Sequence, residues 1–156
     1  MRILLVEDEP TLRAQLHAGL AEAGHVVELA DNGRDAHFMG ETEDFDAVVL
    51  DLGLPLMDGL TVLQRWREQG RKMPVLILTA RDGWHEKVAG IDAGADVIVV
   101  ESGWPRSGSQ ADVVTWGGSP AVARALVALL NFVEYRWLIV QYSVAVYGGI
   151  VAVVFV

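Results

Sequence analysis

The chain has 156 residues, of which 52% are hydrophobic and none is cysteine; this is the size of one domain with a short appendage, and it argues against a disordered chain, disulfides and thiolate metal sites. The apolar run at residues 3–6 is far too short for a signal peptide, so we expect a cytoplasmic protein. The net charge is −9, and residues 1–96 hold 18 of the 21 acidic residues, which argues against direct nucleic-acid binding by this part of the chain.

Through residue 100, short apolar runs alternate with helical patterns. Pro10 is a favourable first residue of a helix, which has leucines at helical spacing and ends at Gly24. In chain order we predict a strand at 3–6, a helix at 10–24, a strand at 26–30, a helix at 33–40, a strand at 45–50, a helix at 60–70, a strand at 74–78, a helix at 83–92 and a strand at 97–100. Apolar strands that alternate with helices indicate an α/β fold, in which a doubly wound parallel sheet is covered on both faces.

Polar residues follow three of the predicted strands. Glu7 and Asp8 end the first strand, Asp51 ends the third and Thr79 ends the fourth. Ligands of such sheets bind beyond the carboxyl ends of the strands, and carboxylates gathered there repel one another unless a cation lies among them. Oxygen ligands favour Mg²⁺, and a carboxylate beside that ion can attack phosphorus while a hydroxyl holds the phosphoryl oxygens.

A purely structural interpretation of these residues is also open. Glu7 and Asp8 are acids of a kind favoured at a helix N-terminus, and they come just before Pro10. Asp51 alone is also consistent with a cap at a strand end, and Thr79 alone with a β-forming residue. The four histidines have no ligand-like spacing, so we assign no metal to them.

Five stretches, in the right order and spacing, resemble the receiver domains of two-component response regulators. They are residues 3–9, 48–52, 54–59, 74–81 and 94–96. The resemblance covers residues 1–96 and is closest to the OmpR/PhoB branch, whose members carry a winged-helix DNA-binding domain. It implies a flavodoxin-like (CheY-like) fold with a five-stranded parallel sheet in the order 2-1-3-4-5.

The resemblance also implies roles for single residues. Asp51 would accept a phosphoryl group from a sensor histidine kinase, and Thr79 would hydrogen-bond that group. Glu7, Asp8, Asp51 and the backbone carbonyl of Gly53 would hold Mg²⁺, with Glu7 acting through water. The chain would then be a phosphoacceptor rather than an enzyme, with at most self-catalysed phosphotransfer and dephosphorylation, in a family that usually regulates transcription.

The chain departs from the family after residue 96. Glu101 occupies the position of the family's lysine, Ile98 that of its switch aromatic residue and Ser102 that of its cis proline. A glutamate reverses the sign of the lysine–phosphoryl interaction, which is worth at most about 4 kcal/mol at roughly 4 Å and an effective dielectric near ~20. The alternative function is therefore a scaffold (a pseudo-receiver) whose binding is independent of phosphorylation.

The C-terminal part is a hydrophobic extension that is atypical of the family. We predict a receiver core at 1–101, a loop at 102–119 and a helix at 120–135 that substitutes for the family's fifth helix. Residues 137–156 carry no charge; a β-hairpin is slightly favoured over a membrane segment, and self-association is a further alternative. A frame change or fusion near residue 97 would explain the abrupt change. No winged-helix domain fits here, so we expect no direct DNA binding by this chain.

Overall fold

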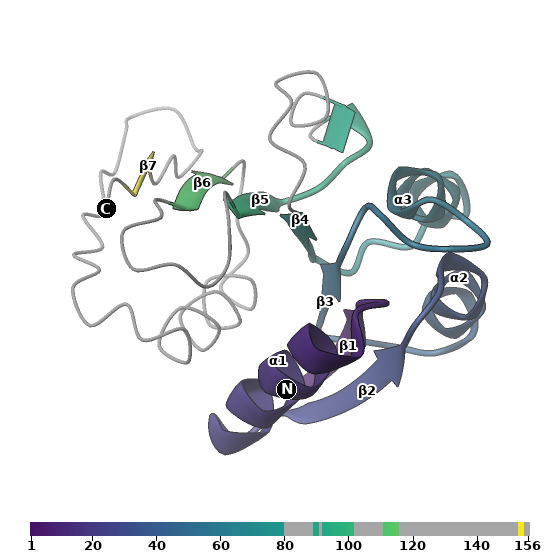
Figure 1. The fold of residues 1–156 in the computed structure, drawn as a ribbon. Coiled ribbons are helices and arrows are strands. Elements are labelled where there is room, and N and C mark those ends of the chain that lie inside the picture. Colours follow the sequence, from purple (N-terminus) through teal and green to yellow (C-terminus); the bar gives the residue numbers. More distant parts are fainter. Residues whose placement is uncertain (80–88, 91, 102–110, 116–152, 155–156) are drawn as a thin grey trace.

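The computed structural model describes residues 1–79, 89–90, 92–101, 111–115 and 153–154 (Figure 1). In chain order the elements are β1 (Arg2–Val6), α1 (Pro10–Glu22), β2 (Val26–Ala30), α2 (Gly33–Thr42), β3 (Ala47–Leu50), α3 (Gly59–Glu68), β4 (Val75–Thr79), β5 (Val97–Glu101), β6 (Ala111–Thr115) and β7 (Val153–Val154). Each predicted strand through residue 101 is present, with its bounds shifted by no more than two residues.

The strands form one sheet in the order β2-β1-β3-β4-β5-β6-β7. Strands β1 to β5 pair in parallel, which confirms the doubly wound fold and the predicted order of these five strands. β6 pairs with β5 and β7 with β6, both antiparallel. Within the described residues, two antiparallel strands thus extend the predicted five-stranded parallel sheet to seven strands.

β6 corrects the prediction of a loop at 102–119. Its sequence, Ala-Asp-Val-Val-Thr, contains three successive β-branched residues, which favour an extended pleated backbone. The run pairs with the outer edge of β5, from Val97 opposite Thr115 to Glu101 opposite Ala111. The surrounding Gly, Ser, Trp and Pro residues obscured this short strand in the sequence.

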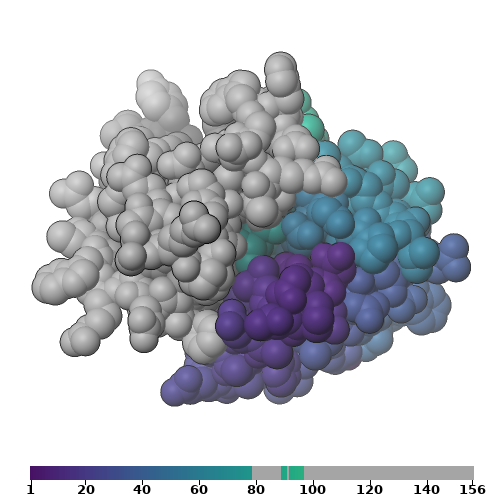
Figure 2. Space-filling view, in the orientation of Figure 1, coloured from purple at the N-terminus to yellow at the C-terminus, as the bar shows by residue number. Residues whose placement is uncertain are grey.

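Each face of the parallel sheet has its own hydrophobic core. Along β1, Leu4 and Val6 belong to a core that includes Trp66 of α3, whereas Ile3 and Leu5 belong to a second core that includes Leu16 of α1. All four β1 side chains are fully buried, as expected for a strand covered on both faces. Figure 1 shows α1 on one side of the sheet and α2 and α3 on the other. In the space-filling view the purple N-terminal part, which includes α1, borders the blue part that includes α2 (Figure 2).

Several predictions concern residues outside the described part of the chain. Of the helix predicted at 83–92, residues 89, 90 and 92 are described, and they are helical. The helix predicted at 120–135 and most of the tail at 137–156 lie outside the described residues, except that Val153 and Val154 pair with β6. Among the helices that the structure describes, none has the length and apolar character needed to cross a bilayer.

Candidate functional site

Three carboxylates meet at the carboxyl ends of two neighbouring strands. Glu7 and Asp8 follow β1, and Asp51 follows β3, which pairs with β1 in parallel. The Asp51 N–H donates to the carbonyl oxygen of Val6 at 3.0 Å and so extends this pairing by one residue. One carboxylate oxygen from each of the three acids lies within 4.8 Å of the others. The parallel register therefore brings together the acids that the sequence placed at strand ends.

The Asp51 carboxylate is oriented by the two peptide groups that follow it. Oδ1 accepts a hydrogen bond from the Leu52 N–H at 2.7 Å, and Oδ2 accepts one from the Gly53 N–H at 3.1 Å. The residue is half-buried and therefore accessible from solvent.

Gly59 allows the start of α3 to approach the Asp51 backbone. Its N–H donates to the Leu52 carbonyl oxygen at 3.1 Å, and a Cβ at this position would lie 2.2 Å from the Asp51 carbonyl oxygen. Asp58 caps the helix by accepting a hydrogen bond from the Leu60 N–H at 3.0 Å. No side chain therefore fits at Gly59 without moving the loop that carries Asp51.

The far end of the same loop is held by the start of α2. The Gly33 N–H donates to the Pro55 carbonyl oxygen at 3.1 Å, and a Cβ on Gly33 would lie 1.8 Å from the Met57 carbonyl oxygen. Between these contacts Leu56 has a φ of 67°, a left-handed backbone conformation that favours glycine, and its side chain is exposed. The loop that carries Asp51 is thus fixed at both ends and strained at its tip.

Glu7 is buried beside like charges. Only 5% of the residue is exposed. Burial, followed by the nearby Asp51 and Asp8 carboxylates, raises the pKa of Glu7 to about 7, although a hydrogen bond from the Glu9 N–H to Oε1 at 3.1 Å acts in the opposite direction. A carboxyl group in these surroundings needs either a proton or a nearby cation.

Glu9, rather than Glu7 or Asp8, is the acid that caps α1. Its two carboxylate oxygens accept hydrogen bonds from the N–H groups of Thr11 at 2.9 Å and Leu12 at 2.6 Å. These backbone hydrogen bonds lower the pKa of Glu9. The structural interpretation of an acid at the helix N-terminus therefore applies to Glu9 and leaves Glu7 and Asp8 for the rim of the sheet.

Sequence reasoning missed Arg13. Its Nη1 donates to the Glu7 carbonyl oxygen at 2.8 Å and to the Asp8 carbonyl oxygen at 3.3 Å. The only signal in the sequence was an arginine one helical turn after the cap, which is too common to indicate a role.

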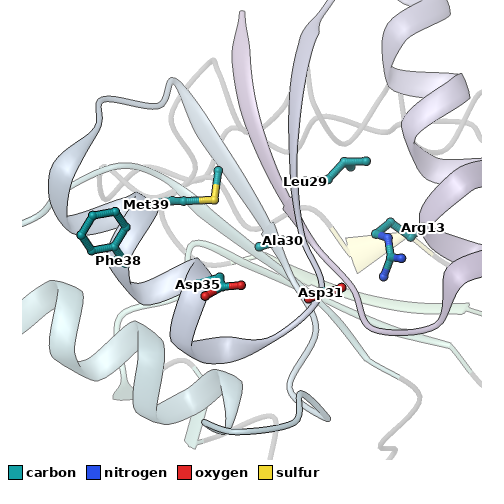
Figure 3. A pocket seen from close by; sticks show the side chains of 7 residues that line it. All are labelled: Arg13, Leu29, Ala30, Asp31, Asp35, Phe38 and Met39. Atoms are coloured by element: carbon teal, nitrogen blue, oxygen red, sulfur yellow. The ribbon is translucent and has the colours of Figure 1, made fainter.

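Arg13 also lines a hollow of about 510 Å³ between α1, β2 and α2, together with Leu29, Ala30, Asp31, Asp35, Phe38 and Met39 (Figure 3). Glu7, Asp8 and Asp51 do not line it, so it is separate from the acidic site.

The residues at 94–96 have a structural role that the sequence did not reveal. Arg67 of α3 donates through Nε and Nη2 to the Gly94 carbonyl oxygen, at 3.2 and 2.9 Å. The Asp96 carboxylate accepts a hydrogen bond from the Val75 N–H at 2.9 Å and lies 3.6 Å from Arg67 Nη2. These contacts tie α3 and β4 to the turn that enters β5.

The backbone of β4 and β5 gives the places of three further predicted residues, Thr79, Ile98 and Glu101. Thr79 is the last residue of β4 and pairs in register with Val100 of β5, so β5 ends one residue later at Glu101, on the same rim as the acids. Ile98 pairs with Ile77 of β4, further back in the sheet. The side chains of Thr79, Ile98 and Glu101 lie outside the described part of the structure.

Comparison with known proteins decides the family. A model of the response regulator receiver domain matches residues 3–102. The chain belongs to this family. The receiver is 46% identical over 101 residues to the two-component response regulator PhoP of Pseudomonas aeruginosa, a match that covers 65% of the chain and 45% of PhoP. PhoP is of the OmpR/PhoB type, which confirms the predicted branch over the receiver region. The chain thus spans less than half the length of this relative.

Two solved structures similar to the receiver contain a metal ion, and one of them also contains a phosphorylated aspartic acid. The receiver domain of the sensor histidine kinase PA1611 from Pseudomonas aeruginosa PAO1, with a magnesium ion coordinated in the active site cleft, matches with a TM-score of 0.61 and 26% identity, over 85% of this chain and 96% of that one. A response regulator protein from Burkholderia pseudomallei with a phosphorylated aspartic acid, calcium ion and citrate matches with a TM-score of 0.57 and 25% identity, over 61% of this chain and 56% of that one.

Proposed function

We propose that Asp51 of this receiver accepts a phosphoryl group from a sensor histidine kinase in a reaction that requires Mg²⁺. The observation that carries the proposal is the meeting of Glu7, Asp8 and Asp51, with carboxylate oxygens within 4.8 Å of one another. The phosphorylated aspartic acid of the similar Burkholderia pseudomallei protein supports it. The receiver is then a phosphoacceptor and not an enzyme in the usual sense.

The residues present fit a divalent cation. Glu7 is buried beside the Asp51 and Asp8 carboxylates, its pKa is raised mainly by that burial, and the donor set consists only of oxygens. Asp8, Asp51 and the Gly53 carbonyl would hold Mg²⁺ directly, and Glu7 through water. Bound there, Mg²⁺ would offset the negative charge of the phosphoryl group. The magnesium ion in the similar PA1611 receiver supports this assignment.

The chain's own part in the transfer is to present a fixed nucleophile. One Asp51 oxygen forms a bond to phosphorus while the phosphorus–nitrogen bond to the kinase histidine breaks, and the bonding electron pair returns to the imidazole nitrogen. The Leu52 and Gly53 N–H groups hold the carboxylate in one orientation throughout. The Thr79 hydroxyl would then donate a hydrogen bond to a phosphoryl oxygen.

The wider role follows from the relatives. Like PhoP, the receiver would serve two-component signalling in the cytoplasm and would take part in the regulation of transcription. We assign no direct nucleic-acid contact to this chain, because its net charge of −9 repels a phosphate backbone.

Incubation with acetyl phosphate and Mg²⁺, followed by intact-mass measurement, tests the proposal. We expect the wild-type chain to gain one phosphoryl group, and we expect no gain for Asp51→Asn or for wild type in EDTA. Asp92→Asn is the matched control, because Asp92 is exposed and lies outside the acidic cluster, and it should be labelled as wild type is. Labelling of Asp51→Asn, or none of wild type, would contradict the proposal.

The end of β5 favours one alternative function, a scaffold that binds its partner independently of phosphorylation. In the sequence, Glu101 stands at the rim position where the family has a lysine, one residue after the pair Thr79–Val100. In that case the half-life of the phosphorylated wild type would be short, and Glu101→Lys would lengthen it. An equal half-life for both chains would argue against a disabling role for Glu101.

A further inference from the structure

Arg13 binds the acidic segment that leaves β1. It lies in the first turns of α1 and is half-buried. Its Nη1 donates to the carbonyl oxygens of Glu7 at 2.8 Å and Asp8 at 3.3 Å, and its backbone N–H donates to the carbonyl oxygen of Glu9 at 2.9 Å. One residue therefore holds three successive carbonyl groups of the segment.

These contacts restrict the Asp8 side chain. Peptide units are planar, so the carbonyl groups of Glu7 and Asp8 define the orientations of the two peptide planes that flank the Asp8 Cα. When both carbonyls are held by one guanidinium, the direction of the Asp8 Cα–Cβ bond is also held. Asp8 is exposed, so burial does not orient it. A planar guanidinium is better suited to this task than a flexible ammonium group.

We propose that Arg13 is a positioning residue for the cation site, and that it acts by fixing the backbone of Glu7 and Asp8. This inference rests on the proposed function, because it concerns the same Mg²⁺ site. The positive charge of Arg13 and its hydrogen bonds have opposite effects on the affinity for Mg²⁺. A cationic side chain near the site repels Mg²⁺, so removing its charge alone would tighten binding. Removing its hydrogen bonds would loosen the acidic segment and weaken binding.

Mg²⁺ titration by isothermal calorimetry separates these effects. We expect Arg13→Met to raise the Kd for Mg²⁺ about tenfold, the range seen when an outer-shell partner of a metal ligand is lost. Arg13→Lys keeps the repelling charge and only part of the donor capacity, so its Kd should also lie above that of wild type. Arg65→Met is the matched control, since Arg65 is exposed in the last turn of α3, at the opposite end from Gly59. It should bind Mg²⁺ as wild type does.

Each outcome has a defined meaning. A Kd for Arg13→Met equal to or lower than that of wild type would overturn the positioning role while leaving the proposed function intact. Failure of wild type to bind Mg²⁺ would overturn the proposed function, and this inference with it. If circular dichroism shows that Arg13→Met does not fold, Arg13→Lys decides alone: a Kd equal to wild type overturns the role, and a raised Kd supports it.

Discussion

At the scale of the residue, Glu7 is the one buried charged side chain among the described residues. The pKa of its carboxyl group is raised to about 7, mainly by burial and then by the charges of Asp51 and Asp8. A cluster of acids with one member buried is destabilising when no cation is bound, because the charged form of Glu7 is disfavoured in the folded state. The free energy of unfolding should therefore depend on pH through the ionisation of Glu7.

Glu7→Gln tests this dependence in EDTA. The folded-state pKa of Glu7 lies above its unfolded value, so its contribution to stability is fully present below about pH 4.5 and is lost as the pH rises through about 7. We expect the free energy of unfolding of wild type, relative to Glu7→Gln, to fall by about 3 kcal/mol across this window. Urea denaturation at several pH values gives both curves.

Glu9→Gln is the matched control for Glu7→Gln. The pKa of Glu9 is lowered by its helix-capping hydrogen bonds, so its contribution is present above its unfolded pKa and is lost as the pH falls. The two glutamine variants should therefore diverge from wild type in opposite directions on the pH axis. Parallel curves for wild type and Glu7→Gln between pH 4.5 and 7 would contradict the buried charge at this site.

The single residues also show what a sequence can reveal about the site. Glu7, Asp8 and Asp51 were predictable because each lies within two residues of the end of a predicted strand, and parallel strands end on the same rim. Arg13 and Arg67 were not, because both donate hydrogen bonds to backbone carbonyls, and a carbonyl is present at every position regardless of the side chain. Contacts of this kind depend on the turn geometry that only the folded chain displays.

At the scale of the element, α2 packs closely against α3 at Gly40. A Cβ on Gly40 would lie 2.4 Å from the ring of Trp66, which is fully buried. The indole Nε1 donates to the carbonyl oxygen of His37 at 3.1 Å, so the ring has a fixed orientation and little freedom to withdraw. The spacing of these helices, which carry Gly33 and Gly59 to the loop that follows Asp51, depends on this contact.

Gly40→Ala should destabilise the protein even though alanine is the better helix former. Propensity favours alanine by about 1 kcal/mol, whereas overpacking against an indole costs typically ~1–3 kcal/mol. In a Trp66→Phe background the smaller ring leaves room, so Gly40→Ala should be neutral or stabilising there. Urea denaturation of the double-mutant cycle should give a coupling energy of at least about 1 kcal/mol. Additive effects would show that the two residues are not in contact.

The elements themselves differ in how far the sequence predicts them. β1 and β3 could be predicted from the sequence because strands buried on both faces appear as continuous apolar runs. β6 was missed because it has five residues and lies among residues typical of loops, and its identity as a strand depends on pairing with β5, a partner that precedes it by about ten residues. Antiparallel addition to a sheet edge leaves only a weak pattern in the sequence.

At the scale of the whole molecule, the acidic front part and the uncharged tail meet in one sheet. The net charge of −9 arises from residues 1–96, whereas residues 137–156 contain no charged side chain. Within the described residues, Val153 and Val154 pair with Val114 and Val113 of β6 and so form the outermost strand of the sheet on that side. This pairing favours a place for the end of the tail in the protein over a place in a bilayer.

Deletion of residues 137–156 distinguishes the two locations of the tail. If β7 covers the edge of β6, its removal exposes the backbone donors and acceptors of β6, and an uncovered strand edge promotes association between copies. We expect the shortened chain to sediment as larger species than the full chain in analytical ultracentrifugation, and we expect neither chain to float with phosphatidylcholine–phosphatidylglycerol vesicles. Flotation of the full chain alone would assign the tail to the membrane. Asp112→Lys in the shortened chain should reduce its association, because a lysine on an exposed edge strand opposes pairing between copies.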